Sequence, residues 1–240
     1  MTRIVAVDLG LLPYAKALEI QRAAARARLS GELRDDVLLL VEHPPVVTLG
    51  RAAQKANVVV PQDLLATRGV EVFEVERGGD VTFHGPGQLV GYPIFDLRQH
   101  KQDLHWYLRQ LEEALILALQ SYELLAWRNA GYTGVWVGPE RPRKIASIGV
   151  HARDWVTWHG FALNVTTDLT QFDRIVPCGI PGVQMTSVER ERGAGSGERN
   201  LWEQAVRAVM RGFETAFGVT TMPAESSIAE LRPSATAQTY

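Results

Sequence analysis

Apolar and polar residues alternate with two different periods along this chain, one typical of helices and one typical of strands, which predicts a fold that contains both. Apolar residues recur at helical spacing over residues 12–31, 61–69, 103–122 and 200–218. Strand-like alternation or short apolar runs occupy residues 3–10, 36–51, 70–76, 88–95, 134–138, 144–153, 155–165 and 185–189.

The residues at the ends of these segments support their boundaries. Pro13 and Gly31 enclose the first helix, Asn200 stands at the N-cap of the last one, and a Pro-Pro pair divides 36–51 into two strands. Gaps of hairpin length predict a mixed, largely antiparallel sheet flanked by helices, in a single domain of the α/β (α+β) class. We expect this domain over residues 1–220, a flexible loop at 191–199 and a disordered tail at 221–240.

Composition excludes several classes of protein. Of the 240 residues, 46% are hydrophobic and 22% charged, and a net charge of −2 argues against nucleic-acid binding. No apolar run approaches the roughly 20 residues that cross a bilayer, and the first residues lack a signal-peptide pattern. The chain has 1 cysteine, which rules out an internal disulfide and fits a reducing compartment. We therefore expect a cytoplasmic protein without membrane contact.

A glycine-rich stretch, RGGDVTFHGPGQ at 77–88, is the first candidate for a ligand site. It lacks the Gly-Lys-Ser/Thr ending of a Walker loop, and its glycine spacing departs from the dinucleotide fingerprint. A tight hairpin would explain the Gly-Pro-Gly turn but not the crowding of polar residues. On a strand, Asp80, Thr82 and His84 would share one face, while the apolar residues between them would share the other. That polar face can line a pocket.

The single cysteine, Cys178, lies in VPCGIPG between a proline and a glycine rather than inside an apolar run. Pro177 fixes its own backbone angle and Gly179 permits unusual ones, so this segment predicts a turn. A turn can present a thiol to a pocket together with backbone N–H groups.

Taken together, RGGDVTFHGPGQLVGYPIFDL, EHPPVVTLGR, RKIASIGVHARDWVTWHGFALNV and PCGI closely resemble the lipoyl(octanoyl) transferase family, over residues 5 to about 220. The resemblance implies the fold of biotin and lipoate protein ligase catalytic domains. It also implies an acyltransferase that takes an octanoyl group from acyl carrier protein. The implied acceptors are lysines on the lipoyl domains of 2-oxoacid dehydrogenases and on the glycine cleavage H protein.

The resemblance also assigns residues to the site. The acyl-thioester nucleophile falls on Cys178 and its paired lysine on Lys144. The substrate-binding segments fall on Arg77, Gly78, Gly79, Asp80, Val81, Thr82, Phe83 and His84, on Ser147, Ile148 and Gly149, and on Gly160, Phe161 and Ala162.

The chemistry of these residue types agrees with the assignment. Exchange between a thiol and a thioester is nearly isoenergetic, so a cysteine keeps the acyl group activated until an amine arrives. A nearby ammonium favours the reactive thiolate, and a lysine can later act as a base. Regular alternation would place Lys144 on the face of Ala146, Ile148 and Val150, opposite Ser147. Backbone N–H groups near Gly149 or Cys178 are both candidates for the oxyanion site.

Several expectations concern cofactors and partners. We expect no cofactor and no metal, since His151 and His159 have no partners at ligand spacing. His84 could have a structural or a pocket-polarising role. The arginines at 51, 77, 141 and 143 could attract an acidic carrier protein, or be scattered surface charges. We expect a monomer. An ATP-dependent lipoate or biotin ligase, and a non-catalytic acyl-binding protein, are the alternatives.

Overall fold

The structure is a computed structural model that describes residues 3–193 and 200–223. Most of the loop expected at 191–199 and of the tail expected at 221–240 lies outside the described residues. The helices are α1 (Tyr14–Ser30), α2 (Gln62–Thr67), α3 (Leu104–Gln120), α4 (Val188–Arg192) and α5 (Leu201–Phe217), with 3-10 turns η1 (Lys55–Asn57), η2 (Leu97–Gln99), η3 (Leu169–Arg174) and η4 (Pro177–Gly179).

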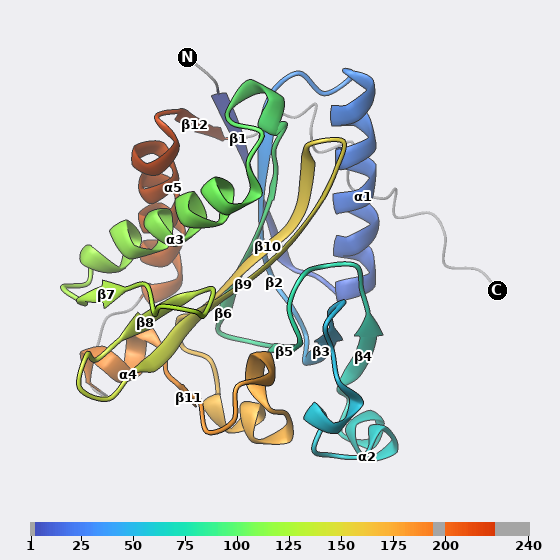
Figure 1. Cartoon of the computed structure of the whole chain (residues 1–240), viewed down its shortest axis with the longest axis vertical. Helices are drawn as coiled ribbons and strands as arrows, with labels where there is room; N and C mark the ends of the chain where they lie inside the picture. Colours follow the sequence, from blue (N-terminus) through green and yellow to red (C-terminus); the bar gives the residue numbers. More distant parts are fainter. Residues whose placement is uncertain (1–2, 194–199, 224–240) are drawn as a thin grey trace.

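The strands of the large sheet are β1 (Arg3–Leu11), β2 (Asp36–Glu42), β6 (Gln88–Ile94), β7 (Ala126–Trp127), β8 (Val135–Val137), β9 (Arg143–Arg153), β10 (Val156–Asn164), β11 (Gln184–Met185) and β12 (Thr220–Pro223). They lie in the order β12-β1-β2-β6-β10-β9-β8-β7, and β11 pairs with β9 (Figure 1). The pairs β12–β1, β1–β2 and β11–β9 are parallel, and the remaining pairs are antiparallel. The mixed, largely antiparallel sheet that the sequence predicts is confirmed.

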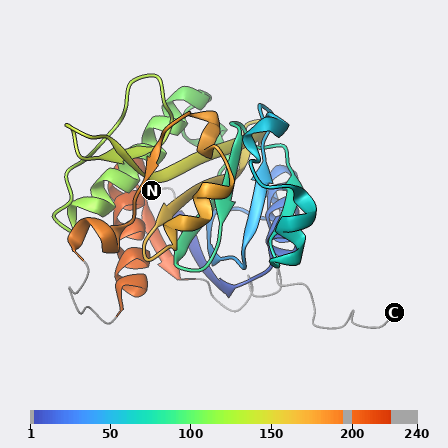
Figure 2. The same ribbon diagram turned by 90° about the horizontal axis from the view of Figure 1, so that it is seen from below.

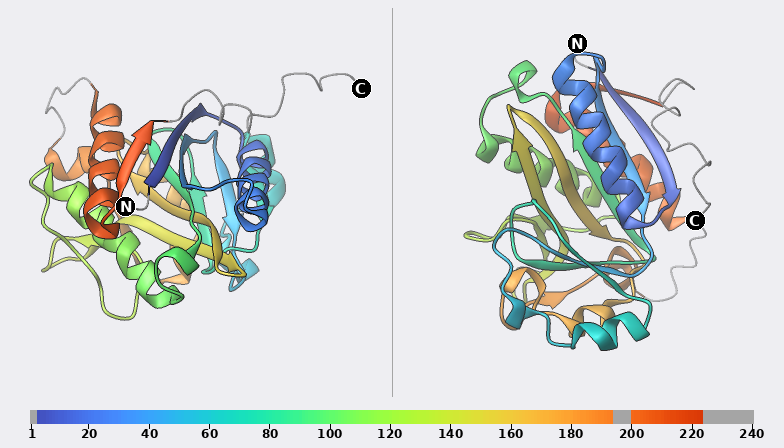
Figure 3. Two further views of the ribbon diagram at one scale, coloured as in Figure 1. Left: turned by 90° about the horizontal axis from the view of Figure 1, so that it is seen from above. Right: turned by 90° about the vertical axis from the view of Figure 1, so that its right-hand side faces the viewer.

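Helices cover both faces of this sheet. α1 lies on one face, while α3 and α5 pack side by side on the other (Figures 1 and 3). The core is accordingly divided into a cluster under α3 and α5, which includes Leu115 and Phe213, and a cluster under α1, which includes Ile20 and Leu39. The central strand β10 is buried along its whole length because both of its faces are covered.

A second sheet of three short strands closes one end of the molecule. It consists of β4 (Glu71–Glu74), β3 (Val46–Leu49) and β5 (Val81–His84), in that order. α2, η3 and the Cys178 turn gather at the same end, onto which Figure 2 looks. The Pro-Pro pair lies between β2 and β3, where the chain passes from the large sheet into the small one. The polar stretch at 77–88 runs into β5 and is thereby placed at the junction of the two sheets.

The helix ends follow the sequence with two exceptions. Pro13 and Gly31 bound α1 as predicted, Gly31 having a left-handed φ of 83°. Asn200 does stand at the N-cap of α5, but its side chain makes no capping hydrogen bond. The strand expected at 185–189 is wrong beyond Met185, because the Ser187 hydroxyl accepts the Arg190 N–H at 3.2 Å and starts α4.

The C-terminal boundary of the domain also involves a strand that the sequence did not reveal. β12 pairs in parallel with β1 across residues 220 to 223. This strand spans the boundary expected between residues 220 and 221. Its short polar sequence, Thr-Thr-Met-Pro, carries no apolar alternation that would indicate a strand.

Candidate active site

A cavity of about 320 Å³ opens at the junction of the two sheets, between β9, β10, β5 and the Cys178 turn. All of the predicted site residues line it except Gly78 and Phe83. Phe83 points to the opposite face of β5 and packs edge-on against Phe172, as the alternation predicts. The Gly78 backbone N–H donates to the Val150 carbonyl at 2.8 Å, which holds the 77–80 loop against β9.

Cys178 lies on the tight turn that its neighbours predict. Its φ of 57° is left-handed, and Gly179 continues the turn with a φ of 67°. A Cβ at Gly179 would collide with the carboxylate of Asp80. Asp80 is itself held by the Asn57 side-chain amide at 2.6 Å, and the Asn57 carbonyl accepts the Val176 N–H at 2.7 Å. Asn57 of η1, far away in the sequence, therefore holds the turn that carries Cys178 through its contacts with Asp80 and Val176.

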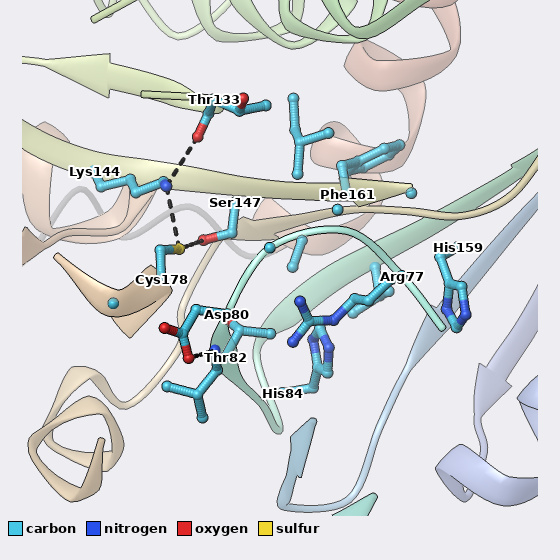
Figure 4. A pocket seen from close by; sticks show the side chains of 18 of the residues that line it. Arg77, Asp80, Thr82, His84, Thr133, Lys144, Ser147, His159, Phe161 and Cys178 are labelled. Atoms are coloured by element: carbon cyan, nitrogen blue, oxygen red, sulfur yellow. Dashed lines mark hydrogen bonds between the residues drawn. The ribbon is translucent and has the colours of Figure 1, made fainter. Parts of the chain in front are cut away.

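Lys144 meets Cys178 inside the cavity (Figure 4). Its Nζ lies 3.2 Å from the Cys178 Sγ and donates to the Thr133 carbonyl at 2.9 Å, and only 1% of the residue is exposed. The Ser147 hydroxyl lies 3.7 Å from the same sulfur. At this distance the lysine amine can donate a hydrogen bond to the sulfur and exchange a proton with it.

The strand alternation predicted for Lys144 is wrong, and the reason is a β-bulge. Opposite β8, the pairing steps from Val135 with Ala146 directly to Trp136 with Lys144, which leaves Ile145 as an extra residue. The bulge rotates Lys144 away from the face of Ala146 and onto the cavity face, which it shares with Ser147. Without this extra residue, Lys144 would point into the core under α3 and α5.

Arg77 is buried on the opposite wall of the cavity. Its Nη2 donates to the Thr48 carbonyl at 2.6 Å and to the Thr48 hydroxyl at 2.9 Å, and its Nη1 donates to the Gly78 carbonyl at 3.0 Å. Burial lowers the pKa of Arg77, but a guanidinium stays protonated at physiological pH. Arg77 thus ties the 77–80 loop to β3 and leaves a positive charge on the cavity wall.

The inner end of the cavity is formed by aromatic and histidine side chains. His84 bonds to the Gln88 side-chain oxygen at 2.7 Å, and the Tyr14 ring stacks on it at 6.0 Å between ring centres. Behind them, His43 bonds to the Tyr92 hydroxyl at 2.8 Å. Burial lowers the pKa of His84 to about 3 and that of His43 to about 4, so both rings are neutral at physiological pH. His84 therefore both lines the cavity and has a structural partner.

Sequence reasoning missed Tyr14, His43 and Tyr92 at this inner end. Tyr14 lies on α1, outside the segments that carry the family resemblance. His43 and Tyr92 lie inside EHPPVVTLGR and RGGDVTFHGPGQLVGYPIFDL, but the resemblance assigns neither of them to the site. Both tyrosines are also core residues by burial. The packing of α1 against β6 brings Tyr14 to the cavity wall that Tyr92 also lines, and His43 lies behind them.

The model of the lipoyl protein ligase A/B catalytic domain matches residues 13–214 of this chain. The chain belongs to the lipoyl protein ligase A/B catalytic domain family. Among its relatives, the octanoyltransferase of Gloeobacter violaceus is 46% identical over 223 residues, covering 93% of this chain and 94% of that protein. The octanoyltransferase of Rubrobacter xylanophilus is 55% identical over 186 residues, covering 77% and 81%.

Solved structures of ligases share the fold of this member of the family. A bipartite lipoate protein ligase of Thermoplasma acidophilum superposes with a TM-score of 0.74 at 17% identity, covering 97% of this chain and 91% of that one. A lipoate-protein ligase A bound with ATP superposes with a TM-score of 0.74 at 16% identity, covering 96% and 92%. At these identities the likeness confirms the predicted ligase-like fold and says nothing of the reaction.

The two histidines considered as metal ligands both lie beside Glu76. His151 bonds to the Glu76 carbonyl at 3.1 Å, while the His159 Nε2 lies 3.8 Å from the Glu76 carboxylate. Over residues 3–193 and 200–223, no three side chains of the metal-ligating types cluster. Within the same residues, no helix is long and apolar enough to cross a membrane.

Proposed function

We propose that this chain, an octanoyltransferase of lipoate biosynthesis, works through an acyl-thioester on Cys178. Its donor is octanoyl-acyl carrier protein. Its acceptors are the lysines of lipoyl domains of 2-oxoacid dehydrogenases and of the glycine cleavage H protein. The observation that carries the proposal is the 3.2 Å contact between Cys178 Sγ and Lys144 Nζ on the wall of the cavity. By analogy with the octanoyltransferase relatives, the transferred acyl group is octanoyl.

In the first half-reaction, the Cys178 thiolate attacks the thioester carbonyl of the donor. The new S–C bond forms, the bond to the carrier's sulfur breaks, and the leaving thiolate takes a proton from the Lys144 ammonium. Backbone N–H groups near Gly149 or Cys178 hold the developing oxyanion. The products are acylated Cys178, a free carrier thiol and a neutral Lys144 amine.

In the second half-reaction, the acceptor lysine attacks the Cys178 thioester. An ordinary lysine is almost entirely protonated at neutral pH, since its pKa is about 10.4, so only its small neutral fraction reacts. Lys144, left neutral by the first step, takes the proton that the attacking amine loses. The C–S bond breaks, the amide forms, and the thiolate–ammonium pair is restored.

The acyl chain extends from Cys178 towards the inner end of the cavity. Ala162 on β10 leaves space there, and Val90 on β6 provides an apolar surface. A side chain at Gly160 would overlap the Gly91 backbone and Pro93, so this position must remain glycine. Each buried methylene of the acyl chain contributes about 0.8 kcal/mol to binding.

A transfer assay tests the proposal. Wild-type protein is incubated with octanoyl-carrier protein and an unmodified lipoyl domain, with ATP omitted and EDTA present, alongside Cys178→Ala and Cys178→Ser. We expect octanoylated lipoyl domain with the wild type only. A strict requirement for ATP would indicate a ligase instead, and full transfer by Cys178→Ala would contradict the thioester route.

A further inference from the structure

A buried carboxylate lies behind Lys144, on the far side of one peptide group. Glu112, on α3, has no solvent exposure. Its Oε1 accepts the backbone N–H of Gly134 at 3.1 Å. The carbonyl of the same peptide group, that of Thr133, accepts the Lys144 Nζ at 2.9 Å (Figure 4).

The peptide between residues 133 and 134 is trans, since the described chain contains no cis peptide bond. In a trans peptide the N–H and the C=O point in opposite directions. The carboxylate, the peptide and the ammonium are therefore connected in series, and the next contact in that series is Lys144 to Cys178 at 3.2 Å.

Charges in this order reinforce one another. A carboxylate at the N–H end polarises the peptide and makes its carbonyl oxygen a stronger acceptor. A stronger acceptor favours the ammonium form of Lys144, and the ammonium in turn favours the Cys178 thiolate. We propose that Glu112 is a positioning residue of the active site, which orients and polarises the 133–134 peptide so that Lys144 stays charged and directed at Cys178.

The backbone at Gly134 fits this role. Its φ of 125° is accessible essentially to glycine only. A Cβ there would lie 2.6 Å from the Ala146 carbonyl oxygen and 2.7 Å from the Lys144 Cε. The loop thus brings its peptide against Lys144 by a conformation and a close approach that both require glycine.

Other charged groups act on the same series and have to be accounted for. Glu112 Oε2 also accepts Arg109 at 2.5 Å and Arg128 at 3.2 Å, both of which are partly exposed. Around Lys144 and Cys178, the cavity wall carries the charged or titratable groups of Arg77, Asp80, His84, Tyr14, Tyr92, Tyr132 and His159. None of these groups hydrogen-bonds to the 133–134 peptide among the bonds found in the described residues.

Alkylation of Cys178 by iodoacetamide, followed against pH in the full chain, tests the inference. The inference rests on the proposed function in taking Cys178 as the reacting thiol, but alkylation requires neither acyl donor nor acceptor. A wild type that alkylates as described and fails to transfer octanoyl groups would therefore contradict the function alone. Glu112→Gln keeps an oxygen acceptor and removes the charge. Glu113→Gln, the same change one residue along at a partly exposed carboxylate, is the matched control.

We expect Glu112→Gln to slow alkylation about twofold to fourfold at neutral pH, because a polarised hydrogen-bond chain is strengthened by about 10–30% per bond. The difference should vanish at alkaline pH, where the thiol is ionised in every variant, and Glu113→Gln should match the wild type. A purely structural role for Glu112 would lower the melting temperature and leave the pH dependence unchanged, and that result would overturn the inference. If Glu112→Gln loses its cooperative melting transition, Glu112→Asp decides, because the shorter side chain keeps the charge and draws it away from the Gly134 N–H. Glu112→Asp should slow alkylation at neutral pH more than at alkaline pH, and an unchanged profile would overturn the inference.

Discussion

Removing the charge of Lys144 should slow the reaction of Cys178 with an alkylating reagent at neutral pH. Lys144→Met keeps much of the apolar stem of the side chain, which lies buried near Trp136 and Gly134. It deletes the ammonium that lies 3.2 Å from the Cys178 sulfur. The substitution therefore changes the electrostatics of the pair more than its packing.

The size of the decrease in alkylation rate follows from the energy of the hydrogen bond that is lost. A hydrogen bond between charged partners in a buried site contributes about 1.5 to 3 kcal/mol, and each 1.4 kcal/mol corresponds to a factor of ten in an equilibrium. Losing this contact should lower the alkylation rate at neutral pH by at least about tenfold. At strongly alkaline pH the rates of Lys144→Met and wild type should converge, because the thiol then ionises without help.

Two further variants separate charge from base catalysis. Lys144→Arg retains a positive charge, so its alkylation should stay closer to that of the wild type than Lys144→Met. It should still lose most acyl transfer, because a guanidinium does not give up its proton readily. Arg141→Met removes a nearby exposed charge and should leave the pH profile unchanged. Identical alkylation profiles for Lys144→Met and wild type would refute the pairing of Lys144 with Cys178.

Three other predictions follow from the geometry. Gly179→Ala should reduce transfer at least about tenfold, as measured by steady-state kinetics, because a Cβ would collide with Asp80 at a φ of 67°; wild-type rates would contradict this account of the turn. A hexanoyl donor should show a specificity constant about fifteenfold below that of an octanoyl donor, since two methylenes at about 0.8 kcal/mol each are missing; equal constants would mean that the chain is not buried. Burial lowers the pKa of His43 to about 4 and of His84 to about 3, whereas an unfolded histidine has a pKa of about 6.5. The unfolded chain therefore binds more protons as the pH falls below about 6.5, and each histidine should remove about 1.4 kcal/mol of stability per pH unit down to about pH 4. Urea unfolding at about pH 7 and about pH 5 should show this loss, with a smaller slope in His43→Gln, and equal stabilities would contradict it.

The sequence predicts the elements of this fold well because their signals are local. Pro13 and Gly31 mark the ends of α1, and the apolar pattern of β9 and β10 marks the two long central strands. The turn at Cys178 likewise follows from the proline and glycine beside it. These are properties of a few neighbouring residues, and neighbouring residues are what periodicity and turn chemistry describe.

The geometry of the site depends instead on contacts between distant segments. The face of Lys144 is set by a bulge at Ile145, which only the pairing with β8 reveals. Glu112 follows the helical pattern of α3 and gives no sign that it reaches the loop 22 residues further on. Tyr14 lies in the first helix that the sequence predicts, and it proves to be both a core residue and part of the cavity wall. Tertiary packing brings these groups together, and no local pattern encodes it.

The central claim is that Cys178 carries the acyl group, and the intact mass of the protein tests it most directly. Wild-type chain is mixed with octanoyl-carrier protein, without ATP and without acceptor, and its mass is recorded before and after hydroxylamine. We expect a gain of one octanoyl group, mapped to the peptide that contains Cys178, removed by hydroxylamine and absent from Cys178→Ala. An unmodified wild type, or an adduct that persists in Cys178→Ala, would contradict the account.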